Sequence, residues 1–311
     1  MDVLQVTGLV KRYKEVVALD GFDLTVANGE IFGLLGPNGS GKTTAINCAL
    51  QLLTYSKGQI AVFGQPMSPT RYDLKRRIGL VPQQVAVFPE LNVAENIDYF
   101  CSLYVNDRSR RRKLVAQAVE FVGLERFAKF RPRKLSGGLV RRLNIACGIA
   151  HRPDLIFLDE PTVAVDPQSR NAILDGIKTL RDEGATVVYT SHYMEEVEQI
   201  CTRVMIMDRG RAVAVGATQE LKSMVGVGER VEVELDQVSD AVLPAIRQLP
   251  QTQQAELSGD RLRVTCARGA HNLTEVLAVL NRLGVGFGRV YSEPATLNDV
   301  FLELTGTQLR D

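Results

Sequence analysis

The pattern of apolar and polar residues begins with strand-like segments. Residues 3–13 and 19–26 are short β-rich runs bounded by turn residues, which favours antiparallel strands at the start of the chain. Residues 30–35, EIFGLL, form a continuous apolar run followed by glycines, which is typical of a buried strand in a mostly parallel sheet. We therefore expect an N-terminal antiparallel β-subdomain beside the first strand of a different sheet.

From about residue 84 to residue 150 the spacing of apolar residues changes to that of helices. Asn92 and Glu95 lie three residues apart at the start of one such segment, which predicts a capped helix. Residues 110–124 repeat apolar side chains at helical intervals. Strand–helix alternation returns over residues 155–216. The pattern predicts an α/β core of mostly parallel strands interrupted by a helical insertion.

A second, smaller unit follows this core. Its pattern has the order βαββαβ, with the outer strands predicted near residues 230–235 and 286–292, and it ends in a further helix. We expect a first domain at residues 1–222, with the insertion at about 84–150, and a small α+β accessory domain at 229–311. The accessory domain carries no motif of its own, so a regulatory role, a role in stabilising a dimer and simple packing all stay open.

Composition narrows the possible partners and compartments. The 37 Lys and Arg residues nearly cancel the 36 Asp and Glu residues, and a net charge of +1 argues against a nucleic-acid partner. The five cysteines are scattered and form no C-x-x-C pair, so we interpret them as reduced, apolar residues of a cytosolic protein. We expect no secretory signal and no membrane span, because the chain contains no uncharged apolar run of about 18 residues.

One glycine-rich segment carries the strongest chemical signal. Residues 36–43, GPNGSGKT, fit the pattern G-x-x-x-x-G-K-[ST] and lie between the predicted strand 30–35 and a predicted helix. Its glycines let backbone amides point inward around a phosphate chain, while Lys42 reaches the β- and γ-phosphates and Thr43 offers a hydroxyl to Mg²⁺. The segment predicts a P-loop NTPase core.

Two adjacent carboxylates follow a later apolar strand, LIFLD. Asp159 ends this strand at the sheet edge that faces the phosphate loop, where its carboxylate can join the Mg²⁺ shell, usually through water. Glu160 comes next and is the candidate to orient or deprotonate the attacking water. An isolated Asp-Glu pair is usually a solvated strand end, so the phosphate loop ahead of it makes this interpretation specific.

Two other strand ends carry less specific candidates. His192 follows the apolar strand 186–190, where its side chain could contact the γ-phosphate, although a histidine there is more often a satisfied structural residue. Gln83 ends the strand that begins at Ile78, and its amide could reach metal or water, although a glutamine after proline is commonly part of a loop. Both lie at strand ends, as Asp159 does.

A second pair of glycines poses a question. Ser136, Gly137 and Gly138, in the sequence LSGG, open an apolar segment with helical character, and free N–H groups at the start of a helix favour anions. The chain thus carries a second anion-binding segment far from the first one.

In this order, the segments resemble the nucleotide-binding ATPase subunit of ATP-binding cassette (ABC) transporters over roughly residues 2–220. The resemblance rests on Tyr13, GPNGSGKTT, Gln83, LSGG, LIFLDEP, Asp166 and His192. It implies that two subunits meet head to tail and that the LSGG of each closes over ATP held by the phosphate loop of the other. Hydrolysis would then remove the bridging contact, so that nucleotide state becomes mechanical state.

The resemblance gives each candidate a role. Tyr13 would stack on adenine, and His192 would sense the γ-phosphate. Asp166 would lie in the loop that joins the two sites, and Gln83 would link the ATP site to the groove where a membrane subunit docks. The expected catalytic residues are Glu160, His192 and Lys42, and the expected metal ligands are Thr43, Gln83 and Asp159. The residues expected at the nucleotide are Tyr13, Gly36, Pro37, Asn38, Gly39, Ser40, Gly41, Lys42, Thr43, Thr44, Gln83, Ser136, Gly137, Gly138 and Asp166.

The sequence EPATLNDVFLELTG, residues 293–306, resembles the end of ATPase subunits of ABC-2-type exporters. The resemblance implies an ATPase that uses ATP and Mg²⁺, pairs with a second ATPase subunit, expected to be an identical copy, and binds separate integral membrane permease subunits at the cytoplasmic face of the cell membrane. The expected cargo is a drug, antibiotic, lipid or polysaccharide. The alternatives are a soluble ABC-type ATPase acting on ribosomes or DNA, and an importer ATPase.

Two positions depart from the usual family pattern. Leu139 follows LSGG where Gln is usual, which weakens an interfacial hydrogen bond but leaves the amide cradle intact. Residues 163–166 read VAVD instead of a small-residue form ending in GLD. We expect slower or differently coupled turnover with ATP binding retained. The basic run at 107–113, DRSRRRK, is expected to be a solvated helix face, with contact to an anionic membrane surface or permease as the alternative.

Overall fold

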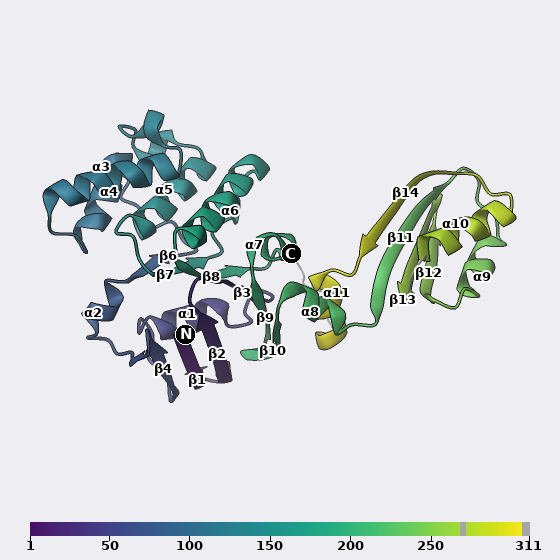
Figure 1. The fold of residues 1–311 in the computed structure, drawn as a ribbon, viewed down its shortest axis with the longest axis horizontal. Coiled ribbons are helices and arrows are strands. Elements are labelled where there is room, and N and C mark those ends of the chain that lie inside the picture. Colours follow the sequence, from purple (N-terminus) through teal and green to yellow (C-terminus); the bar gives the residue numbers. More distant parts are fainter. Residues whose placement is uncertain (268–271, 307–311) are drawn as a thin grey trace. The chain divides into compact units, whose positions relative to one another are not determined.

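The computed structural model describes residues 1–267 and 272–306, and the chain divides into two units, residues 1–218 and the described part of 219–308 (Figure 1). Each unit has a hydrophobic core of its own. The fold class predicted from the sequence, an α/β P-loop core with an antiparallel β-subdomain and a small α+β unit, is confirmed. The boundaries 1–222 and 229–311 stay predictions.

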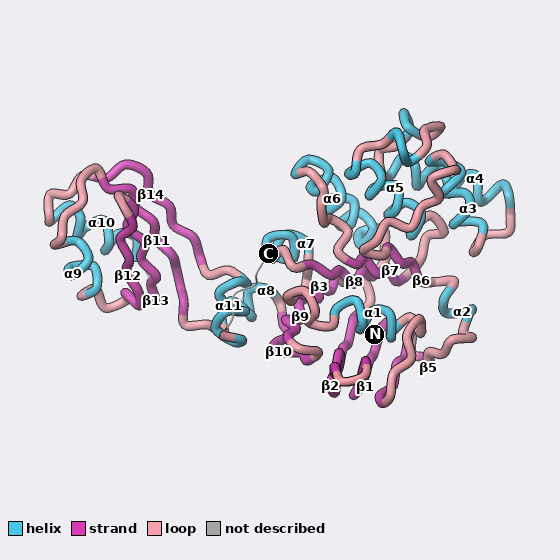
Figure 2. The backbone as a smooth tube through the Cα atoms, turned by 180° about the vertical axis from the view of Figure 1, so that it is seen from behind, coloured by secondary structure: helices cyan, strands magenta, loops and turns pink. Residues whose placement is uncertain are grey.

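Two sheets build the first unit (Figures 1 and 2). One is four-stranded, in the order β2-β1-β4-β5, and its strands pair antiparallel. The other is six-stranded, in the order β10-β9-β3-β8-β7-β6, and is parallel except for the β9–β10 pair. The strands are β1 (Asp2–Tyr13), β2 (Val16–Ala27), β3 (Ile31–Leu35), β4 (Lys57–Val62), β5 (Gln65–Pro66), β6 (Ile78–Val81), β7 (Leu155–Asp159), β8 (Thr186–Ser191), β9 (Arg203–Asp208) and β10 (Arg211–Gly216).

The parallel strands explain where the candidate residues meet. Every residue of β3, β7 and β8 is buried, as continuous apolar runs require when both faces of a parallel sheet are covered. In register, Leu35 pairs with Ser191 and Asp159 pairs with Thr190, so these strands end at one edge of the sheet. That edge carries the phosphate loop, the Asp159–Glu160 pair and His192, and strand β6 brings Gln83 to it.

The helices of the first unit cover the six-stranded sheet and form the insertion (Figure 1). Asn92 and Glu95 make the predicted reciprocal cap at the start of α3. No helix in the described ranges has the length and apolar character needed to cross a bilayer. The helical segments are α1 (Lys42–Ala49), α2 (Tyr72–Lys75), α3 (Val93–Ser102), α4 (Arg108–Phe121), η1 (Glu125–Phe127), η2 (Pro132–Lys134), α5 (Gly137–Ile149), α6 (Pro167–Asp182) and α7 (Met194–Ile200).

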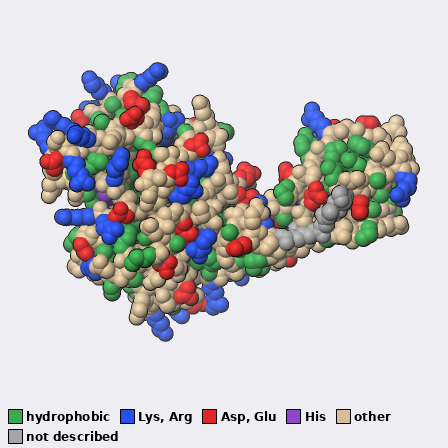
Figure 3. All heavy atoms as spheres, viewed as in Figure 1, with side chains coloured by type: hydrophobic (Ala, Val, Ile, Leu, Met, Phe, Trp, Pro, Cys, Tyr) green, Lys and Arg blue, Asp and Glu red, His purple; other side chains and the backbone are tan. Residues whose placement is uncertain are grey.

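The basic run of the sequence forms the start of α4. Arg108, Arg110, Arg112 and Lys113 are exposed, while Arg111 makes an ion pair with Asp98 at 2.8 Å. Figure 3 shows Lys and Arg side chains at the surface of this end of the first unit. Their exposure fits the predicted solvated helix face.

The second unit is a four-stranded antiparallel sheet in the order β12-β13-β11-β14, with α9 and α10 packed together on one face (Figure 1). Its core joins alternate residues of β11 and β13 to apolar residues of α10. A reciprocal cap by Thr296 and Asp299 starts the last helix. The elements are α8 (Thr218–Ser223), β11 (Val227–Leu235), α9 (Val242–Arg247), β12 (Thr252–Ser258), β13 (Arg261–Ala267), α10 (Asn272–Arg282), β14 (Phe287–Pro294) and α11 (Leu297–Thr305).

The five cysteines are buried, as the apolar interpretation predicts. Burial raises the pKa of each thiol above its ordinary value, to about 11 for Cys266. Because the thiolate is the reactive form, none of these side chains is poised as a nucleophile.

Candidate nucleotide-binding site

The phosphate loop joins β3 to α1 and wraps around a lysine of its own. Lys42 Nζ donates to the carbonyl oxygens of Gly36 at 2.7 Å and Pro37 at 3.2 Å. Gly41 has a φ of +106°, and a Cβ on it would lie 2.7 Å from the Ala18 carbonyl oxygen. Only glycine fits this turn, because any side chain would be both strained and blocked by backbone. The loop is therefore built tightly enough to fix the lysine.

A cavity of about 370 Å³ lies in front of the loop. It is lined by Ala18, Asn38, Gly39, Gly41, Lys42, Thr43, Thr44, Gln83 and Glu160. All of these except Ala18 were predicted as site residues. The hydroxyl of Ser40 is buried in the loop with no hydrogen-bond partner among the described residues. A lysine, a spare hydroxyl and a turn rich in N–H groups are donors, so the cavity suits a phosphate chain.

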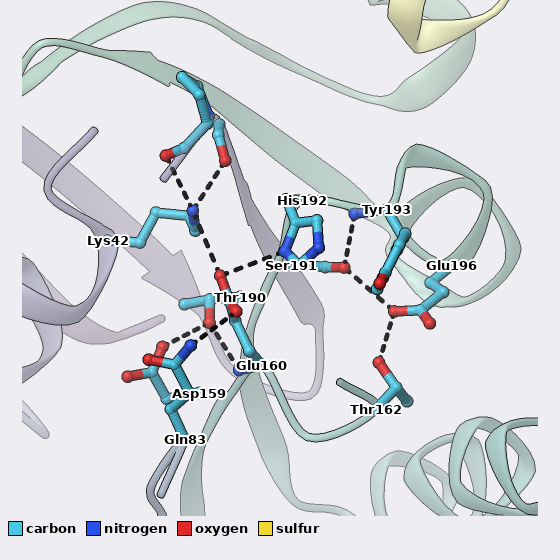
Figure 4. A network of polar contacts seen from close by, with 12 residues as sticks. Lys42, Gln83, Asp159, Glu160, Thr162, Thr190, Ser191, His192, Tyr193 and Glu196 are labelled. Carbon is cyan, nitrogen blue, oxygen red and sulfur yellow. Dashed lines mark hydrogen bonds and ion pairs between the residues drawn. The ribbon is translucent and has the colours of Figure 1, made fainter. Parts of the chain in front are cut away.

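The Glu160 carboxylate is where the predicted catalytic residues converge (Figure 4). Its Oε1 lies 3.5 Å from Lys42 Nζ and 3.4 Å from His192 Nδ1. Its Oε2 accepts a hydrogen bond of 3.0 Å from the Gln83 side-chain amide. Glu160 is only 5% exposed. The structure thus brings three other segments, those of Lys42, Gln83 and His192, to one carboxylate.

The backbone of Glu160 is held in an unusual conformation. Its φ is +45°, in the left-handed region that a non-glycine residue enters only at a cost of about 1–3 kcal/mol. Its N–H donates to Thr190 Oγ1 at 2.9 Å, and the same hydroxyl donates to Asp159 Oδ1 at 2.6 Å. Thr190 therefore fixes both acidic residues. The sequence analysis did not name it, although it lies two residues ahead of His192.

The electrostatics of the cavity depend on burial. Burial lowers the pKa of the Lys42 ammonium from its ordinary value, and the Glu160 carboxylate beside it opposes this shift. Lys42 has three donor hydrogens and lies 3.5 Å from the carboxylate, so it can release Glu160 and turn to an incoming anion without losing all of its partners.

Arg141 is a second residue that sequence reasoning missed. It is 6% exposed and donates to the Gln83 carbonyl oxygen at 2.7 Å and to the Glu160 carbonyl oxygen at 3.3 Å. It lies three residues after Gly138, on the same face of α5. The signal available in the sequence was an arginine three residues after Gly138 in a helical segment. It ties the helix that LSGG begins to two strand ends of the site.

The LSGG segment does not line the cavity of its own chain. Ser136 is the N-cap of α5, and its Oγ accepts a long hydrogen bond of 3.4 Å from the Leu139 N–H. A Cβ on Gly137 would meet nothing within 4 Å, whereas one on Gly138 would lie 2.7 Å from Ser169 Oγ and 3.0 Å from Asp166 Oδ2. One glycine faces open space, and the other is packed against the start of α6.

Asp166 and Tyr13 also lie away from the cavity lining. Asp166 is the N-cap of α6 and accepts from the Ser169 N–H at 2.9 Å, which holds the pKa of its carboxyl below the usual value. In the loop before it, Ala164 has a φ of +59°, where the usual family form offers glycine. Tyr13 is 43% exposed, with Lys11 Nζ 4.7 Å from its ring centroid. Its predicted contact with adenine stays a prediction.

A phosphate loop with a buried lysine and carboxylate at the carboxyl edge of a parallel sheet defines a P-loop ATPase. The family model described as ABC transporter matches residues 19–163. Over 99% of this chain, 36% of residues are identical to the linearmycin resistance ATP-binding protein LnrL of Bacillus subtilis, which is covered in full. A Nod factor export ATP-binding protein I of Cupriavidus metallidurans is also 36% identical, over 99% of each chain. The chain belongs to the ABC transporter family, as an ATP-binding subunit that hydrolyses ATP.

A solved structure similar to this chain is the dimeric, post-hydrolysis form of an ATP-binding cassette bound to ADP and Pi. The two share 28% identity and a TM-score of 0.64, over 69% of this chain and 98% of that one. These two relatives are named as a resistance and an export ATP-binding protein, so the alternatives of a ribosome- or DNA-associated ATPase and of an importer are not favoured.

Proposed function

We propose that this chain is the ATPase subunit of an exporter, that it works as a pair of identical copies, and that it binds ABC-2-type permease subunits at the cytoplasmic face of the cell membrane. Residues 1–222 would form the ATPase domain and residues 229–311 an accessory domain. The names of its relatives, a linearmycin resistance protein and Nod factor export proteins, support an export role. The proposed cargo is a drug, antibiotic, lipid or polysaccharide.

One observation carries the proposal of a pair. The phosphate loop and LSGG are both built to hold anions, yet Ser136, Gly137 and Gly138 do not line the cavity that contains Lys42. Gly137 faces open space and Ser136 is exposed. A second copy placed head to tail would set this segment against the phosphate chain from the opposite side. Each ATP would then contact both copies.

The residues present fit a hydrated Mg²⁺ ion beside the phosphate chain. The Thr43 hydroxyl, the Asp159 carboxylate and the side-chain amide oxygen of Gln83 are the hard oxygen ligands that this ion prefers. Gln83 uses its amide N–H on Glu160, so its oxygen is the atom left for the metal. When bound, the ion supplies positive charge to the phosphate oxygens.

The chain's own groups divide the work of hydrolysis. The Glu160 carboxylate accepts a hydrogen bond from Gln83, while Thr190 holds the Glu160 backbone N–H, and this carboxylate orients the attacking water and accepts its proton. The Lys42 ammonium compensates charge on the transferred phosphate, and His192 contacts the same group from the end of β8. Burial makes these interactions stronger than in bulk water, because the local dielectric constant is lower.

An aromatic surface beside the site supports docking of a permease segment. Phe88 follows Gln83 by five residues and packs edge-on against Tyr99, with ring centroids 4.8 Å apart. These side chains are 40% and 45% exposed, and Leu103 near them on the chain is 58% exposed. Asn96 holds the Phe88 backbone at both its N–H and its carbonyl oxygen. An exposed aromatic surface that begins five residues after Gln83 suits an apolar helix from a membrane subunit.

The test of this function uses Glu160→Gln in the full chain, with Glu183→Gln, an exposed glutamate on the same unit, as matched control. The variant should bind Mg-ATP, lose at least about a hundredfold in turnover because the proton acceptor is gone, and form a dimer by light scattering. The control should hydrolyse like the unchanged chain. Brisk turnover by Glu160→Gln would remove Glu160 from catalysis. Solitary particles at saturating Mg-ATP, with and without the permease, would overturn the pair.

A further inference from the structure

A second group of polar side chains surrounds Glu196 of helix α7, beside the Glu160 network (Figure 4). Glu196 is 2% exposed. Its Oε2 accepts hydrogen bonds from the hydroxyls of Thr162 at 2.7 Å, Tyr189 at 2.7 Å and Ser191 at 3.0 Å. Three donors on one buried oxygen form a closely satisfied network.

The other oxygen of this carboxylate faces a cation. Arg170 of α6 lies with its Nε 3.3 Å from Glu196 Oε1, and its guanidinium also lies 5.1 Å from the centroid of the Tyr193 ring. Arg170 is therefore shared between Glu196 and the residue that follows His192. The Tyr193 N–H in turn donates to Ser191 Oγ at 2.9 Å, so the residues on both sides of His192 are held.

The partners of Glu196 belong to three segments, and each of these segments carries a candidate site residue. Ser191 immediately precedes His192. Thr162 lies two residues after Glu160 in the same loop. Arg170 lies in the first turns of α6, the helix that Asp166 caps. One buried side chain thus joins the histidine, the catalytic glutamate and the loop that contacts LSGG.

A purely structural role would not need this chemistry. Removing a carboxylate from water is costly, and an apolar residue of similar size is often as stable or more stable at a buried position. What the carboxylate adds is directional: it fixes the rotation of three hydroxyls and the position of one guanidinium. The contacts run to segments that each carry a site residue, rather than along α7 itself.

We propose that Glu196 is a positioning residue of the ATPase. It holds His192 and the loop from Glu160 to Asp166 in one shared arrangement, so that a shift of His192 toward phosphate is transmitted to the loop that faces the second copy. Glu196 does not line the cavity that contains Lys42, and it acts through Ser191 and Arg170. This inference rests on the proposed function, because it assumes that His192 and Glu160 act on ATP.

The test replaces Glu196 by Gln, which keeps the shape and removes the charge. The exposed neighbour Glu195→Gln is the matched control on the same helix. Loss of a supporting contact of this kind lowers activity by about tenfold to a hundredfold, and we expect that loss in kcat with the KM for ATP unchanged. The control should match the unchanged chain in both.

A spectroscopic readout separates positioning from stability. The chain has three histidines, so carbon-13 labelling of their rings gives few signals, and His192→Ala identifies the one of interest. In Glu196→Gln the His192 signal should shift in the absence of nucleotide. Should that variant fail to fold, Ser191→Ala, which deletes a single hydroxyl, should give the same shift. An unmoved His192 signal in a folded variant with lowered kcat would overturn the proposal.

A double-mutant cycle decides whether Glu196 acts through His192. The kcat of the pair Glu196→Gln with His192→Ala should be close to that of His192→Ala alone, because the supported side chain is already gone. Independent, multiplying losses would contradict the proposal. If His192→Ala and Glu160→Gln both keep full turnover, the proposed function fails instead, and the histidine signal still reports whether Glu196 positions His192.

Discussion

The phosphate loop and the LSGG segment are two anion-binding elements of one chain, and they differ in how far their own chain completes them. The phosphate loop is enclosed: its lysine is 5% exposed and is held by two carbonyl oxygens and the Glu160 carboxylate. LSGG is open: Ser136 and Gly137 are exposed, and the cap that Ser136 makes at the start of α5 is a long hydrogen bond of 3.4 Å. One element is enclosed by its own chain, whereas the other is left exposed.

This difference explains why a single chain carries both elements. A site completed within one chain would hold ATP regardless of any partner. In the proposed pair, a site divided between two copies would close only when both are loaded, so binding energy would be converted into association. Arg141 and Glu196 then matter because they connect the open element and its neighbouring loop to the enclosed one.

The largest expected effect is on ATP affinity and comes from a substitution in the phosphate loop. Lys42→Ala should weaken ATP binding by at least about a hundredfold in the full chain, because the phosphate charge loses a buried cation with three donors. Titration calorimetry with Mg-ATP measures the affinity, and Lys57→Ala, an exposed lysine of β4, is the control. Unchanged affinity in Lys42→Ala would contradict the assignment of the phosphate loop.

The next largest effect is on dimer formation and comes from a substitution in LSGG. Ser136→Arg should abolish ATP-induced dimer formation in the Glu160→Gln background while one copy keeps its ATP affinity, because the added bulk and charge lie outside its own cavity. Light scattering measures the first property and calorimetry the second. Ser136→Ala, which removes only the helix cap, should cost about 1 kcal/mol in the free energy of unfolding. Equal loss of binding and association would mean that LSGG acts within its own chain.

The two glycines of LSGG offer a matched pair. Gly138→Ala should lower the free energy of unfolding by about 2 kcal/mol, since its Cβ would press on Ser169 and Asp166, whereas Gly137→Ala should unfold like the unchanged chain. Gly137→Ala should instead weaken dimer formation, because its Cβ enters the space proposed for the other copy. Chemical denaturation and light scattering separate the two. Equal stability losses would show that the packing of Gly138 does not matter.

The smallest effect is a pH dependence at the far end of the LSGG helix. His151 follows α5, stacks on Tyr104 with ring centroids 3.8 Å apart, and contacts the Ile78 carbonyl oxygen at 3.1 Å. Burial lowers its pKa from 6.5 to about 4, although the hydrogen bond to Ile78 opposes the shift. The unfolded chain therefore binds the proton first as pH falls through 6.5.

The free energy of unfolding should fall by about 1 kcal/mol between pH 8 and pH 6 on account of His151, and further toward pH 4. Denaturant titrations at several pH values measure this, and His151→Phe, which keeps a ring against Tyr104, should remove that part of the slope. An unchanged slope in the variant would assign the pH dependence to other groups. A slope of the opposite sign would contradict the lowered pKa.

Much of the site was predictable from the sequence because its signals are local. A phosphate loop needs glycines at fixed spacing, and apolar runs of five or six residues ending in Asp-Glu or Ser-His read as buried strands with polar ends. Once the strands are parallel neighbours, Lys42, Asp159, Glu160 and His192 must meet at one edge. The capped start at Asn92 is local in the same sense.

The residues that were missed act at long range. Arg141, Thr190 and Glu196 belong to no motif, and each contributes through partners that the fold brings from distant segments, up to 59 residues away for Arg141 and Pro82. The roles of Tyr13 and Asp166 remain predictions, since neither lies at the cavity. A contact between two copies cannot be seen in the structure of one chain.

The sequence by itself determined the class of fold, the phosphate loop and the pair of acidic residues, because backbone freedom at glycines and the period of apolar residues are properties of neighbours in the chain. Only the tertiary structure decided that Gly137 is open while Gly138 is packed, that Glu160 has a left-handed backbone, and that Glu196 joins three working segments. The physical reason is that burial and close approach depend on which distant surfaces meet, and no local pattern encodes that.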